Sequence, residues 1–140
     1  MIFNLWVSKH PRGRQTTIPE DDMTVRHNAD VPLENVPGGT ATSRQVLLDS
    51  ELMPNFAMRR FVMGAGGGMP RHTNAVEHEQ YVLKGRARIT IGDSIHEVET
   101  DDAVYIPAGV PHSYEVLDEP FEFLCVVPNL PDAIEILPAE

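Results

Sequence analysis

The sequence predicts an all-β protein, either a barrel or a sandwich of short strands. From about residue 44 onward, apolar runs of strand length recur every 8–12 residues or so with turn signals between them, which is typical of all-β domains. Between residues 44 and 128 no segment has the length and period of an amphipathic helix. The chain has 140 residues, enough for one domain with its own core.

The apolar runs predict the strands in chain order. They cover residues 45–48, 55–63, 80–83, 87–91, 95–98, 103–106, 113–117 and 121–127. Turn-forming residues mark connections at 64–68, 84–85, 92–93, 101–102, 107–109 and 118–120. The tail at 131–137 fits either one helical turn or a further edge strand. We therefore expect a barrel domain over residues 44–140.

Residues 1–43 are expected to form an extended N-terminal arm or irregular lead-in, because prolines and glycines interrupt any regular pattern. An apolar cluster near the start, Phe3, Leu5 and Trp6, would be exposed to water on a free tail. The segment is either a partly mobile terminus or an arm that packs on a partner subunit. The second interpretation agrees with a homodimer, in which barrel edges pair across a two-fold axis.

Composition disfavours several partners. The chain has 11 basic and 21 acidic side chains and a formal net charge of −10, which disfavours nucleic acid and anionic membrane surfaces. A single cysteine, Cys125, allows no intrachain disulfide. No apolar run approaches the roughly 20 residues of a membrane span, and the N-terminus lacks the features of a signal peptide. We therefore expect a cytoplasmic protein whose ligand or substrate is a small molecule.

Three of the six histidines are placed where they can converge inside a barrel. Residues two apart on a strand face the same side, so His72 shares a face with Asn74, and His78 shares one with Gln80. His112 follows a Pro/Gly turn at the start of another strand. Three neutral imidazoles in an apolar cavity suit one divalent transition metal per chain, with Mn, Fe, Cu, Ni and Zn as candidates. One inward histidine alone is more often a satisfied core residue, so the paired spacing carries the prediction.

The two histidine-bearing stretches resemble the two motifs of the cupin superfamily. The positions in register are Gly66, His72, His78, Gly85, Pro107, Gly109 and His112. The resemblance covers about residues 44–128 and implies a cupin-type double-stranded β-helix, that is, a jelly-roll barrel. Within the superfamily, the chain resembles the small single-domain bacterial and archaeal cupins that bind manganese through four histidines.

Asn74 stands where that subgroup has one of its four histidines. Carried over by position, the resemblance implies that His72, His78 and His112 are metal ligands. The fourth place has three interpretations: Asn74 binds through its amide oxygen, Asn74 hydrogen-bonds a metal-bound water, or Gln80 takes the place. A pocket that has lost its metal altogether is a further alternative.

Tyr114, Phe123 and Cys125 are expected at the pocket. Tyr114 alternates with His112 along one strand, and Phe123 and Cys125 share one strand face. Cys125 is either a small buried hydrophobe or, as the resemblance implies, a residue close to the metal.

The resemblance and the ligand set together predict a metal-dependent cupin, a dioxygenase-like enzyme acting on a small organic substrate. One alternative is a non-catalytic module that binds or senses a small molecule such as a sugar. Another is a non-redox metal isomerase or lyase that uses the ion as a Lewis acid. All three use the same ligand face, so the sequence leaves them open.

Overall fold

The computed structural model describes residues 24–51 and 53–139 of the chain. In this part the backbone forms strands and connections, with a short 3-10 turn at Asn28–Asp30 and no α-helix. The strands are β1 (Glu34–Asn35), β2 (Thr40–Leu48), β3 (Phe56–Asn74), β4 (His78–Ile91), β5 (Ser94–Glu99), β6 (Ala103–Ile106), β7 (His112–Pro128) and β8 (Ile134–Ile136). The all-β prediction is confirmed.

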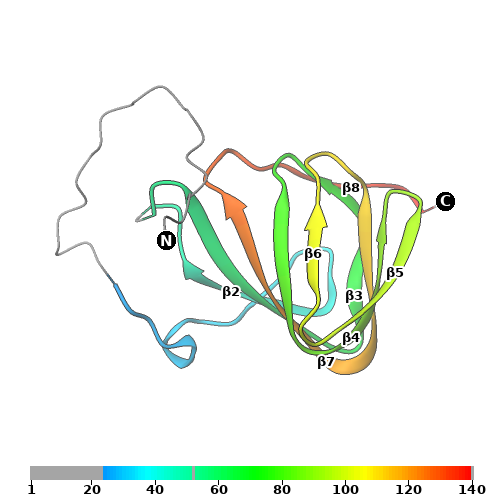
Figure 1. Cartoon of the computed structure of the whole chain (residues 1–140), viewed down its shortest axis with the longest axis horizontal. Helices are drawn as coiled ribbons and strands as arrows, with labels where there is room; N and C mark the ends of the chain where they lie inside the picture. The colour runs from blue at the N-terminus through cyan, green and yellow to red at the C-terminus, as the bar shows by residue number, and fades with distance from the viewer. Residues whose placement is uncertain (1–23, 52, 140) are drawn as a thin grey trace, which may run out of the picture.

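All of these strands belong to one antiparallel sheet. Its order is β1-β2-β3-β7-β4-β5, with β6 paired to β4 and β8 paired to β3. The long strand β7 lies between β3 and β4 and is hydrogen-bonded to both. Figure 1 shows the long strands bending around a common interior, so the sheet closes into a barrel of the predicted jelly-roll kind.

Strand alternation decides which side chains enter this interior. On β4, His78, Gln80 and Val82 are buried, whereas Glu79 and Tyr81 between them are exposed. On β7 every second residue from Phe121 to Val127 is buried in the same way. The shared faces that the sequence predicts for these two segments are therefore confirmed.

Three of the predicted connections lie inside strands. Segments 64–68, 84–85 and 118–120 belong to β3, β4 and β7. The two runs beside 84–85 form one strand, as do the two beside 118–120, and β3 continues past 64–68 as far as Asn74. The pairing register shifts at each of these places, as at a β-bulge. Glycine and proline occur at bulges as well as in turns. The sequence pattern therefore predicted strand ends at places where these strands continue, and that prediction was wrong.

Gly68 shows why glycine is required at one of these shifts. Its φ is +154°, and a Cβ atom there would overlap the carbonyl oxygen of Tyr114 on β7. A residue without a side chain therefore lets β3 come close to β7 immediately before the end of β3 that carries His72 and Asn74.

Both ends of the described chain join the sheet. The tail forms an edge strand, β8, which pairs with residues 72–74 of β3. At the other end, β1 pairs with β2, and the first residues of β2 pair with β3, so the sheet begins before residue 44. The domain boundary at residue 44 stays a prediction. Phe3, Leu5 and Trp6 lie outside the described residues. The described residues contain no helix with the length and apolar character of a membrane span.

Candidate metal and substrate site

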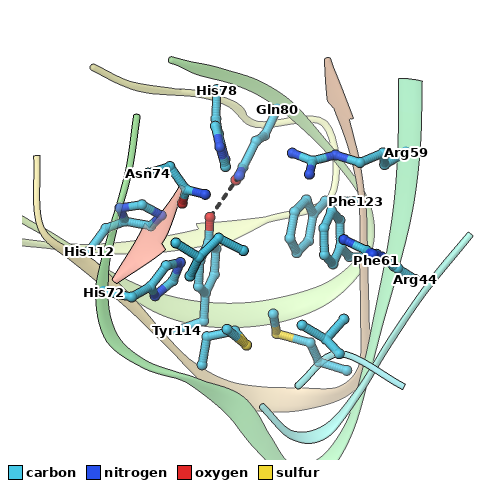
Figure 2. Close-up of a pocket in the computed structure, with 14 residues that line it drawn as sticks. Arg44, Arg59, Phe61, His72, Asn74, His78, Gln80, His112, Tyr114 and Phe123 are labelled. Atoms are coloured by element: carbon cyan, nitrogen blue, oxygen red, sulfur yellow. Dashed lines mark hydrogen bonds between the residues drawn. The ribbon is translucent and has the colours of Figure 1, made fainter. Parts of the chain in front are cut away.

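The barrel interior contains a small pocket with a cavity volume of about 40 Å³, which opens to solvent at its mouth. Strands β2, β3, β4, β7 and β8 all contribute to its wall. The residues that line it are Val36, Arg44, Arg59, Phe61, Met63, Met69, His72, Asn74, His78, Gln80, His112, Tyr114, Phe123 and Ile134 (Figure 2). No carboxylate from the described segments is among them, although the whole chain is acidic.

The structure brings the three predicted histidines together at one end of this pocket. His72 and His112 are directly opposite each other on β3 and β7, and their ring centroids are 4.2 Å apart. The ring of His78, at the start of β4, lies 5.7 Å from that of His112. All three residues are buried, with exposed fractions between 2% and 6%.

Backbone carbonyls fix the orientation of two of these rings. Nδ1 of His72 lies 2.7 Å from the carbonyl oxygen of Pro70, and Nδ1 of His112 lies 2.9 Å from that of Val110. A carbonyl oxygen can only accept, so each Nδ1 carries the proton and each Nε2 keeps its lone pair. Metal-binding histidines are typically held in this way.

Burial favours the neutral form of the three imidazole rings, which is the form that binds metal. Burial lowers the pKa of His78 to about 3, and the positive charge of Arg59 contributes. Burial likewise lowers the pKa of His112 to about 4 and lowers that of His72. The Nε2 atoms of His78 and His112 are buried and have no hydrogen-bond partner.

Asn74 presents its amide oxygen to the same pocket. Its Nδ2 donates to Oδ2 of Asp132 at 2.9 Å, and the other carboxylate oxygen of Asp132 accepts from the backbone N–H of Ala75. Because the carboxylate takes the NH₂ end of the amide, Oδ1 turns the other way, and it is buried without a partner. Sequence reasoning missed Asp132, since it lies in an irregular tail segment far along the chain.

Gln80 is engaged elsewhere in the pocket. Its Nε2 donates to the hydroxyl oxygen of Tyr114 at 2.7 Å, drawn as a dashed line in Figure 2. Burial raises the pKa of Tyr114 well above its usual value, so the hydroxyl keeps its proton at neutral pH. Phe123 also lines the pocket and stacks on Tyr114, with ring centroids 5.5 Å apart.

Cys125 is fully buried and is not among the residues that line the pocket. It lies behind Arg59 and Gln80, and Nη2 of Arg59 donates to its sulfur at 3.3 Å. Burial raises the pKa of the Cys125 thiol, so the sulfur is not set up as a reactive thiolate.

The donor atoms present suit a divalent transition metal. Imidazole nitrogens suit Zn, Cu, Fe and Ni, and an amide oxygen is a harder donor that suits Mn. Two unpartnered imidazole nitrogens and an unpartnered amide oxygen in one pocket are unusual, because buried polar atoms normally have partners. In the described part of the chain, however, no three His, Cys, Asp or Glu side chains are placed so that they could hold a metal ion by themselves.

Two arginines are the charged pocket residues that sequence reasoning missed. Arg59 lies on β3 and shares a strand face with Phe61 and Met63. Arg44 lies on β2, directly opposite Phe61. The signal was an arginine within an otherwise apolar strand face. Both guanidinium groups are visible at the right of the pocket in Figure 2.

A jelly-roll barrel with histidines gathered in its interior is the architecture expected of a cupin. The chain belongs to the cupin family: residues 59–127 match the family model described as Cupin domain. It is 31% identical over 72 residues to an uncharacterized protein of Streptomyces coelicolor, a match spanning 51% of this chain and 69% of that protein.

Comparison with solved structures agrees with this family assignment. The polyketide cyclase RemF from Streptomyces resistomycificus is 31% identical with a TM-score of 0.73, over 83% of this chain and 87% of that one. A cupin-2 domain protein from Rhodospirillum rubrum is 28% identical with a TM-score of 0.70, over 84% and 81% of the two chains. The cupin barrel predicted from the sequence is therefore confirmed.

Proposed function

We propose that this cupin is a metal-dependent enzyme that acts on a small organic molecule held in the barrel pocket. The observation that carries the proposal is the set of unpartnered donors in that pocket: Nε2 of His78, Nε2 of His112 and Oδ1 of Asn74. His72, whose Nδ1 is held by a carbonyl, completes the set with its Nε2. These four residues would hold one divalent ion, and manganese is the first to test because the chain resembles four-histidine manganese cupins.

The pocket supports non-redox chemistry best. All four donors are neutral, so a bound divalent ion would keep its charge and polarise a carbonyl or enol oxygen of the substrate as a Lewis acid. Tyr114 keeps its proton at neutral pH and would donate a hydrogen bond to a substrate oxygen, while Gln80 holds its hydroxyl in place. The apolar wall around Phe61 and Phe123 would exclude water from the bound substrate.

One comparison favours the same chemistry. The solved structure of 31% identity is that of a polyketide cyclase, and cyclisation of a polyketide needs no net oxidation. The dioxygenase-like activity predicted from the sequence is the second candidate. It is supported by the small number of protein donors, which would leave room on the ion for a further ligand.

A single set of measurements tests these alternatives. The purified protein is analysed for metals, stripped with chelator and reloaded with Mn²⁺, Fe²⁺ or Zn²⁺. A 1,3-diketone is then incubated with each form in D₂O, while NMR follows exchange at its central carbon and an electrode follows oxygen. We expect metal-dependent exchange without oxygen uptake. Oxygen uptake would support the dioxygenase-like candidate, and failure to retain any metal would refute metal dependence.

A further inference from the structure

Arg59 is a partly buried cation whose protein partners are weak. Its Nη2 donates to the sulfur of Cys125 at 3.3 Å, and its guanidinium carbon lies 5.3 Å from the centre of the Phe61 ring. A thiol sulfur is a poor acceptor, and Nε of Arg59 is buried with no partner at all. Figure 2 shows the guanidinium directed into the pocket, toward Gln80.

Arg44 completes a pair of such cations. Its Nε is also buried without a partner, and its guanidinium lies beside Phe61 in Figure 2. A partly buried charge without a carboxylate partner is costly, so a pocket that keeps two of them is expected to receive an anion.

Other arginines of the same barrel contrast with this pair. Arg60, Arg86 and Arg88 form ion pairs with glutamate or aspartate at distances between 2.7 and 3.3 Å. Within residues 24–51 and 53–139, no such ion pair joins Arg44 or Arg59 to a carboxylate. Asp132 and Asp49 border an outer groove that also touches Arg59, but they do not line the pocket.

Much of the remaining wall is apolar. Phe61, Phe123, Met63 and Met69 line the pocket together with the arginines and the histidines. Phe61 and Phe123 stack with their ring centroids 5.0 Å apart, which gives this wall a rigid, flat side. A ligand that fits it therefore has an apolar body and one anionic end.

We propose that the pocket binds a small organic carboxylate, with its carboxylate at Arg59 and Arg44 and its apolar body along Phe61 and Phe123. Arginine suits this role because its planar guanidinium can bind a carboxylate through two parallel hydrogen bonds. The proposal rests on the proposed function in one respect, since it assigns the substrate class of the same pocket.

Calorimetric titration with benzoate and benzamide tests the charge directly. These two ligands have nearly the same shape, and only benzoate carries the carboxylate. We expect the metal-stripped full-length protein to bind benzoate at least about tenfold more tightly than benzamide, because the arginines do not depend on the metal. Acetate should bind more weakly than benzoate because it lacks the apolar body.

Variants assign the binding to the arginines. Arg59→Met and Arg44→Met should each weaken benzoate binding by about tenfold or more, and Arg59→Lys should restore only part of it. Arg88→Met is the matched control, because this arginine is on the exposed surface, and it should bind benzoate like the wild type. Circular dichroism confirms that each variant is folded.

Equal binding of benzoate and benzamide, or binding of neither, would overturn the proposal without need of any variant. Wild-type benzoate affinity in both methionine variants would also overturn it. The metal content of Arg59→Met should stay at the wild-type level, because this residue is not among the donors. A protein that binds benzoate but retains no metal would therefore refute the proposed function and leave the carboxylate site intact.

Discussion

At the scale of single residues, the site depends on which polar atoms the fold leaves unpaired. His112 is the central ring, since both other histidines lie against it. Its replacement in His112→Ala removes one donor and the ring against which the other two pack. We expect metal retained after chelator dialysis to fall by more than about tenfold, since even changes to residues that only orient ligands cost 10–100-fold. His96→Ala, at an exposed position, is the control, and full metal occupancy in His112→Ala would contradict the site.

Asn74 and Gln80 are the two candidates for the fourth donor position, and substitutions distinguish between them. Asn74→His should increase resistance to chelator, because imidazole is a stronger donor than an amide for most divalent transition metals. Gln80→Leu should leave metal retention unchanged, since the Gln80 amide is hydrogen-bonded to Tyr114. If instead Gln80→Leu loses the metal and Asn74→His gains nothing, the fourth donor is Gln80.

Some of this site follows from sequence and some does not. His72, His78 and His112 were predictable because strand alternation and a family motif place them on inward faces. Arg59 lies on such a face too, but composition treats an arginine as a surface residue. Asp132 was not predictable in its role, because its contact with Asn74 depends on where the tail crosses the end of β3.

At the scale of strands, Gly68 limits how the barrel can be built. In Gly68→Ala the new Cβ would meet backbone of β7, which cannot move without breaking pairing. We expect a loss of about 3 kcal/mol in the free energy of unfolding, measured by chemical denaturation. Gly66→Ala is the matched control: its φ is +63° with open space around it, so about 1 kcal/mol is expected. Equal losses in the two variants would show that the approach of β3 to β7 is not tight.

The number of strands was harder to predict than their faces. Alternation was predictable in the parts of β4 and β7 where every second residue is buried, from His78 to Val82 and from Phe121 to Val127. The continuity of β3 through 64–68 was not readable, because a bulge and a turn use the same residues. Only the pairing with β7 on both sides of the shift shows that the strand continues.

For the whole molecule, the buried histidines make stability depend on pH. The pKa values of His78 and His112 fall to about 3 and 4 in the folded protein, against about 6.5 in the unfolded chain. Between those pKa values the unfolded state binds more protons than the folded state. The contribution of these histidines to the free energy of unfolding is therefore full above pH 6.5 and is lost as the pH falls.

We expect the metal-stripped protein to lose up to about 1.4 kcal/mol per pH unit for each of these histidines between pH 6.5 and 4.5. Urea denaturation at a series of pH values measures this slope. A double variant, His78→Gln with His112→Gln, should show a smaller slope. The same slope in the variant would assign the acid sensitivity to carboxylates instead.

The predicted homodimer also belongs to this scale. Deletion of residues 1–20 removes Phe3, Leu5 and Trp6, which we expect to bury apolar surface on a partner subunit. The shortened protein should dissociate at a higher concentration, or melt at a lower temperature, than the full chain. Sedimentation equilibrium measures the first quantity, and an unchanged dimer of unchanged stability would show that the segment is only a tail.

The last described strand gives the pocket a wall of low local stability. β8 has three residues, all of them exposed, and yet Ile134 lines the pocket and Asp132 just before it holds Asn74. Short exposed segments open locally at a small fraction of the global unfolding free energy. We therefore expect brief detachment of this strand to open the pocket to ligands while the rest of the barrel stays folded. Amide hydrogen exchange should be faster in β8 than in β7, and a ligand in the pocket should slow exchange in β8 first.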